Sequence, residues 1–169
     1  MLISAPMKGD SIIIGDKAHI MNYERGGMAT FGSIMPTVLP NQPDGTLDLT
    51  KLASSIPTFN DPHCAAVTCV ALESSMNNCH GMVLRPDYLA QVKKITKKNK
   101  IRLHLDGARV WNAAVALDMS MKDYCKDFNT VAVCMSKGMG APVGSLLVGS
   151  HTDIARAKTL RKIAGGSMR

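Results

Sequence analysis

The stretch "TVAVCMSKGMGAPVGSLLVGS", from Thr130 to Ser150, joins two apolar runs through a turn that carries a single lysine. Small and β-branched residues in both runs predict two strands, Thr130 to Met135 and Ser145 to Val148, and glycines mark the turn between them. Lys137 lies on this turn. Because lysine is almost never fully buried without a partner, the stretch predicts that the amine of Lys137 has a function at the end of the first strand.

Predicted strands and helices alternate along the rest of the chain. Apolar runs predict strands within residues 10–16, 33–39 and 64–74, and residues 101–118 predict strand, turn and helix. Helical patterns occur at 49–56, with Asp48 as the expected cap, at 86–100, where Pro86 fits the first turn, and at 153–163. Strands that are apolar on both faces and alternate with helices are typical of a mostly parallel sheet with helices on both faces. We therefore expect one α/β domain, in which ligands bind outside the carboxyl ends of the strands.

The composition argues against a nucleic-acid or membrane partner. The 20 Lys and Arg residues outnumber the 13 Asp and Glu residues, but the densest basic run, Lys93 to Lys100, has the spacing of a solvated helix face. Aromatic residues make up only 4%, too few for the stacking platforms that bind single strands. No apolar run approaches the roughly 20 residues of a membrane span. We therefore expect a soluble cytoplasmic protein, and a basic nucleic-acid-binding function ranks last among the candidates.

Five cysteines are present, without a CxxC pair or the Cys/His spacing of a zinc site. This pattern predicts free thiols in a reducing compartment and no metal centre. Cys134 lies inside an apolar run, and its expected role is packing in the core.

Two predicted strand ends carry side chains that could perform chemistry. Asp106 follows "RLHL" and Lys137 follows "AVCM", so both should project into one crevice if their strands are near neighbours. A structural ion pair, with Asp106 capping the next helix, is the alternative interpretation of an isolated "DGAR". Arg109 lies one turn into that helix and glycines adjoin both positions, which favours a ligand site.

An amine at a strand end can form an imine with an aldehyde, provided that the lysine is unprotonated. A carboxylate opposite the amine can pair with a protonated pyridine nitrogen, which allows the ring of pyridoxal 5'-phosphate (PLP) to accept electrons. The combination of Lys137 and Asp106 is therefore the pattern expected of a PLP-dependent protein.

Four blocks of sequence carry a family resemblance: "GDKAHIMNYERGG" (15–27), "HLDGARVWNAAVAL" (104–117), "VCMSKGMGAPVGSLLVGS" (133–150) and "RKIAGGSMR" (161–169). In the same order along nearly the whole chain, they resemble the low-specificity L-threonine aldolases of the fold type I, aspartate aminotransferase-like superfamily of PLP enzymes. The resemblance implies that residues 1–169 form the central part of the PLP-binding large domain, without the family's N-terminal segment and small C-terminal domain.

The resemblance also implies which residues form the site. Lys137 matches the lysine that carries PLP, Asp106 the aspartate at its ring nitrogen, and His19 the histidine that stacks on the ring. Arg109 matches an arginine that helps to hold the substrate carboxylate and the cofactor, and Arg169 matches an arginine near the phosphate. We therefore expect Lys137 and His19 to be catalytic, Arg109 to bind substrate, and all five residues to bind PLP.

The implied reaction is cleavage of L-threonine, or of similar β-hydroxy-α-amino acids, to glycine and an aldehyde. Such a protein has a small amino-acid substrate, discriminates loosely at the β-substituent, and is expected to form a homo-oligomer.

One block departs from the family pattern. The family's "ENTHN" appears here as "ESSMN" (73–77), with Met76 where a histidine serves the substrate hydroxyl. A shifted match could use His80, but the residues that follow favour the unshifted one. Because methionine cannot transfer a proton, the departure supports an alternative function: a catalytically impaired relative that acts as a PLP-binding or oligomerisation module.

Overall fold

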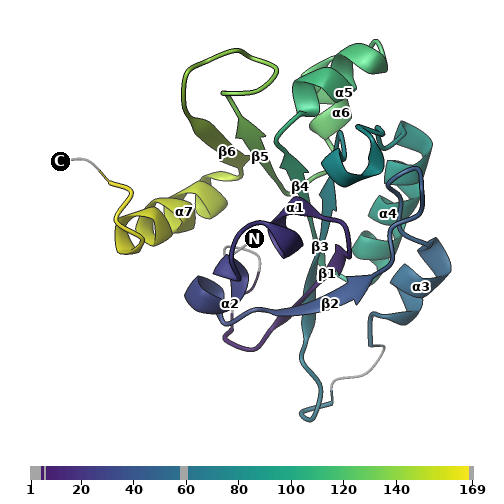
Figure 1. The fold of residues 1–169 in the computed structure, drawn as a ribbon. Coiled ribbons are helices and arrows are strands. Elements are labelled where there is room, and N and C mark those ends of the chain that lie inside the picture. Colours follow the sequence, from purple (N-terminus) through teal and green to yellow (C-terminus); the bar gives the residue numbers. More distant parts are fainter. Residues whose placement is uncertain (1–4, 6, 58–60, 168–169) are drawn as a thin grey trace.

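The residues that the computed structural model describes, 5, 7–57 and 61–167, form one six-stranded sheet with helices packed against it (Figure 1). The strand order is β2-β1-β3-β4-β5-β6, and every neighbouring pair is parallel except β5 and β6. The mostly parallel α/β sheet expected from the sequence is therefore confirmed. The strands are β1 (Ser11–Gly15), β2 (Met35–Leu39), β3 (Val67–Glu73), β4 (Arg102–Gly107), β5 (Thr130–Cys134) and β6 (Ser145–Gly149).

Most helices lie where the sequence predicts them. Asp48 caps α3, because its Oδ1 accepts a hydrogen bond of 2.9 Å from the backbone N–H of Lys51. Helix α7 begins slightly earlier than predicted, at His151, since Ser150 provides its cap. Helix α6 was not predicted, because five residues are too few for a helical period to emerge. The helices are α1 (His19–Asn22), α2 (Gly27–Gly32), α3 (Leu49–Ser54), α4 (Pro86–Lys98), α5 (Val110–Ala116), α6 (Met121–Cys125) and α7 (His151–Ile163), with a 3₁₀ turn at Asn77–Cys79.

The larger core lies between one face of the sheet and helices α3 to α6, which Figure 1 shows to its right. Alternate residues of each strand point to this face, so that Leu103 and Leu105 of β4 meet Leu89 and Val92 of α4 in one cluster. These four side chains are at most 4% exposed. Burying each one contributes about 1.5–3 kcal/mol, which makes this face the main source of stability.

The opposite face carries α1, α2 and α7 and a smaller cluster that includes Ile12, Ile14 and Met28. An ion pair of 2.7 Å between Arg102 of β4 and Asp153 anchors α7 on this side. Helices therefore lie on both faces, as predicted, but the cover is uneven. On β6, Leu146 and Val148 are each 54% exposed. The sheet is thus open toward its β6 edge.

The lysine-rich helix has the structure that the sequence predicts. In α4, Val92 is buried while Lys94, Lys97 and Lys98 are exposed, so the basic run is a solvated helix face. Among the described residues, no helix combines the length and the apolar character needed to cross a membrane.

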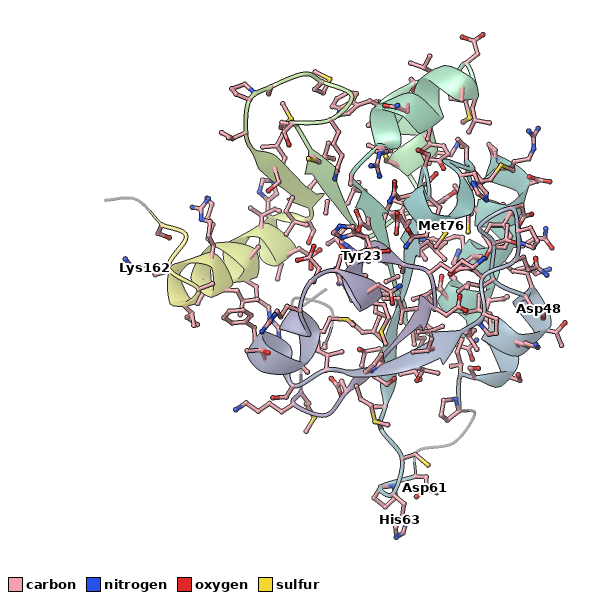
Figure 2. All side chains as sticks on the ribbon, in the orientation of Figure 1. Tyr23, Asp48, Asp61, His63, Met76 and Lys162 are labelled. Atoms are coloured by element: carbon pink, nitrogen blue, oxygen red, sulfur yellow. The ribbon has the colours of Figure 1, made fainter. Side chains whose placement is uncertain are left out.

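Replacing Asp48, which lies at the outer edge of the molecule (Figure 2), by alanine removes the acceptor at the start of α3. We expect Asp48→Ala to lower the free energy of unfolding by about 1 kcal/mol, the usual effect of a lost N-cap, with a lower urea midpoint and an unchanged slope. Thr50→Ala, an exposed change in the same helix, is the control and should shift stability by less than about 0.5 kcal/mol. Equal midpoints for Asp48→Ala and the wild type would contradict the capping role.

Candidate active site

A cavity of about 470 Å³ lies on the more open face of the sheet. Its floor is formed by residues of β4, β5 and β6, and α1 and α2 contribute the opposite wall. His19, Asp106 and Lys137, which the sequence analysis singled out, all line it. The cavity therefore brings together an imidazole, a carboxyl group and an amine from three distant parts of the chain.

The pairing of β4 with β5 brings Asp106 and Lys137 together at the carboxyl ends of the two strands. Asp106 lies beside Ala132 in the parallel register, and Lys137 follows shortly after β5 ends at Cys134. The strands approach closely at Gly107, where an added Cβ would lie 2.9 Å from the carbonyl oxygen of Ala132. The two strands are therefore neighbours, which was the condition for Asp106 and Lys137 to share one crevice.

Asp106 is a buried acid whose environment disfavours its charge. It is 8% exposed, and burial is the main cause that raises the pKa of its carboxyl, followed by the charge of Glu73. Among the described residues, the hydrogen bond to its side chain comes from the backbone N–H of Ala108, at 3.2 Å. This bond stabilises the turn before α5, whose N-cap is Arg109. No ion pair joins Asp106 to Lys137 within the described part of the chain, so the structural ion pair is not formed.

His19 is oriented by groups on its own segment. It is the first residue of α1, and its Nδ1 lies 3.1 Å from Oε1 of Glu24. A carboxylate beside Nδ1 favours the tautomer in which Nδ1 carries the proton. Nε2 is then the ring nitrogen with a lone pair that can accept a hydrogen bond. The ring of Tyr23 lies 5.2 Å from the imidazole, centroid to centroid. The imidazole is thus supported from two sides at the cavity.

His104 also lines the cavity, although the sequence analysis did not assign it to a site. His104 is buried two residues before Asp106, on the same face of β4, and its Nδ1 lies 2.8 Å from Oγ1 of Thr130. Burial holds the pKa of His104 well below its usual range, so the ring is neutral. The period-two alternation of the strand was the signal that could have identified it.

Cys134 corrects a prediction. The sequence placed it in the core, but it is half-buried and lines the cavity. Its position on β5 alternates with Val133, whose side chain belongs to the larger core. The Ser136 hydroxyl, 3.2 Å from Sγ, lowers the pKa of the thiol.

The other predicted site residues have different places. Arg109 is half-buried at the N-cap of α5, next to Ala108, which lines the cavity. Arg169 lies outside the described residues.

Met76 points into the interior, to the right of Tyr23 in Figure 2, and is 1% exposed. Its Sδ accepts a hydrogen bond of 3.5 Å from Nδ2 of Asn41. The residue at the family's histidine position therefore does not reach the cavity.

The amino-acid sequence matches the beta-eliminating lyase family over residues 1–169. The chain belongs to this family. Among curated members, the low specificity L-threonine aldolase of Escherichia coli (strain K12) is 40% identical over 168 residues, which are 99% of this chain and 49% of that protein. The resemblance to low-specificity L-threonine aldolases is thus confirmed, and the chain spans about half the length of the curated relatives that it matches.

Solved structures confirm the fold of this family member. Leishmania major threonine aldolase is similar with a TM-score of 0.84 at 21% identity, over 97% of this chain and 47% of that one. A PLP-bound C-S lyase from Staphylococcus hominis is similar with a TM-score of 0.65 at 14% identity, over 95% of this chain and 41% of that one. The sheet and its helices therefore have the fold type I arrangement.

The residues of the cavity fit the donor set that PLP requires. Lys137 offers an amine to an aldehyde, and Asp106 offers a buried acid without a cation in ion-pair contact among the described residues. A pyridinium nitrogen would supply that cation and favour the ionised carboxylate. The described residues contain no cluster of three or more His, Cys, Asp or Glu that could hold a metal ion.

Asp106→Asn should stabilise the cofactor-free chain near neutral pH. Because the pKa of Asp106 is raised above its unfolded value of 3.8, its contribution to stability is present below about pH 4 and is lost as the pH rises through the folded pKa. We expect the variant to gain stability over the wild type at about pH 7, and the difference to shrink toward about pH 4, in urea unfolding. Asp87→Asn, at an exposed position, is the control. A difference that does not change with pH would contradict this account of Asp106.

Proposed function

We propose that this chain contributes the central part of the PLP-binding large domain of a lyase that cleaves L-threonine and similar β-hydroxy-α-amino acids to glycine and an aldehyde. The observation that carries the proposal is the position of Lys137 and Asp106 at one cavity. The relatives named as L-threonine aldolases support the substrate class.

The chain's own residues supply binding and orientation. Lys137 would carry PLP through its amine, and Asp106 would face the ring nitrogen from the floor of the cavity. His19 would lie against the ring from the opposite wall. Arg109 and Arg169 would hold the substrate carboxylate and the phosphate, as the family resemblance implies. When bound, PLP accepts the electron pair that is released as the Cα–Cβ bond breaks.

The proposed reaction also needs a side chain in the cavity that accepts a proton. The hydroxyl proton of a β-hydroxy amino acid must be accepted as the bond breaks. His19 lines the cavity and has Nε2 free of the contact with Glu24, so it is the side chain that we assign to this role. His104 is neutral but lies at the floor, where it contacts Thr130.

The buried position of Met76 favours a second candidate function. Its thioether packs near Asn41 and Gly45, away from the cavity, and it carries no titratable group. A chain with this arrangement could bind PLP without efficient turnover and serve as a PLP-binding or oligomerisation module. The exposed Leu146 and Val148 on β6 are consistent with further contacts in a homo-oligomer.

Lys137→Ala tests the cofactor site directly. After PLP is added and excess is removed, we expect the wild-type chain to retain cofactor absorbance and, after borohydride reduction, to yield a modified peptide that contains Lys137. The variant should lose at least about 90% of both signals, because Lys137 is the lysine among the described residues that line the cavity. Lys126→Ala, an exposed change, should behave like the wild type. Adduct formation that persists in Lys137→Ala would refute the assigned lysine.

Turnover separates the two candidate functions. Glycine release from L-threonine by the PLP-loaded wild-type chain, abolished in Lys137→Ala, would support the lyase. Retained PLP without glycine release, from a chain shown to be folded, would support the binding module.

A further inference from the structure

Glu73 is a buried carboxylate to which the proposed reaction gives no role. It ends β3, is 6% exposed, and pairs in register with Asp106 of β4. Register partners on parallel strands point to the same face, so Glu73 lies on the side of the sheet that holds the cavity. An ionised side chain at such a position requires compensating hydrogen bonds.

Two backbone groups from separate segments provide these bonds. The N–H of His19 donates to Oε2 at 2.7 Å, and the N–H of Asn77 donates to Oε1 at 3.0 Å. His19 is the first residue of α1, and its N-cap residue, Ala18, makes no side-chain capping bond. Glu73, 54 residues away in sequence, therefore accepts the hydrogen bond from a backbone N–H that is usually satisfied by a local capping side chain.

Asn78 reinforces the same junction. Its Nδ2 donates to the carbonyl oxygen of Lys17 at 2.8 Å, and the hydroxyl of Tyr23 donates to its Oδ1 at 3.3 Å. The loop after β3 is thus bonded to the α1 segment on both sides of His19. The imidazole orientation set by Glu24 and Tyr23 depends on where this segment is held.

We propose that Glu73 is a positioning residue that holds His19 at the cavity wall through the backbone of α1. The part of this inference that concerns PLP rests on the proposed function, because His19 is assigned there to the cofactor ring. Binding groups need a geometry held within about 0.5 Å, so a shift of α1 should weaken the site even though Glu73 itself makes no contact with the ligand.

The charge of Glu73 allows position and electrostatics to be separated. This charge contributes to the raised pKa of Asp106, whereas His19 and Lys137 act in the opposite direction. Removing the charge alone would favour ionised Asp106 and hence a cationic ring beside it. Weaker PLP binding after loss of the charge, together with faster amide exchange of His19, would therefore report a change of position.

The first test is local and needs no cofactor. In Glu73→Gln the amide can accept only through its carbonyl oxygen, so one of the two backbone N–H groups loses its acceptor. We expect amide exchange of His19 or Asn77 to accelerate at least about 10-fold, while exchange at Leu105 in the central strand stays within about 2-fold. Asp48→Ala, which lowers stability away from this junction, should leave His19 and Asn77 unchanged. Unaltered exchange at both residues in Glu73→Gln would overturn the inference.

The second test is a PLP titration followed by absorbance. Glu73→Gln should raise the dissociation constant about 10-fold relative to the wild type, while Asp48→Ala should leave it unchanged. Equal weakening in both variants would indicate a general loss of stability and overturn the positioning role, as would unchanged or tighter binding in Glu73→Gln. If the wild-type chain does not bind PLP, the proposed function fails, and the amide exchange of His19 and Asn77 alone decides this inference.

Discussion

The candidate site depends on the parallel pairing of β3, β4 and β5, which brings the carboxyl ends of these three strands together at one end of the sheet. Glu73 lies beside Asp106, and Asp106 lies beside Ala132, from which the chain continues to Lys137. Parallel strands place their carboxyl ends together, so side chains that are far apart in sequence share one small space. On its other face, each of these strands packs into the larger core.

The two faces of the sheet divide stability from chemistry. Side chains such as Leu103 and Leu105 pack under α3 to α6, while the residues between and beyond them, His104 and Asp106, face the cavity. A single strand thus contributes to both through its period of two. Because the hydrophobic face supplies most of the burial, the opposite face can carry buried polar groups whose own contribution to folding is unfavourable.

The buried carboxyl groups of Glu73 and Asp106 differ in how their charge is compensated. Glu73 has two backbone donors, and its charge is therefore compensated within the protein. Among the described residues, Asp106 accepts one backbone hydrogen bond, from the Ala108 N–H, and its pKa is raised by burial and by Glu73. The second group remains poised for a cationic partner, which is the property that a PLP ring nitrogen would use.

Local patterns were sufficient for much of this architecture. Apolar runs located the strands, Asp48 and Pro86 marked helix starts, and the "HLDGAR" and "SKGMG" turns identified Asp106 and Lys137 as strand-end residues. These features arise from residues within a few positions of one another, where hydrogen bonding and side-chain period act directly on the backbone. They fix the class of fold and two of the candidate residues.

Other features were decided only by the tertiary structure. The sequence could not show that Glu73 caps α1, that Met76 turns inward toward Asn41, or that Cys134 faces the cavity. Each of these depends on which segments meet across the sheet and on which face a side chain lies, and a strand that is apolar on both faces does not reveal that in its composition. The sequence therefore determined the elements and the chemical groups, whereas their distances and environments came from long-range strand pairing.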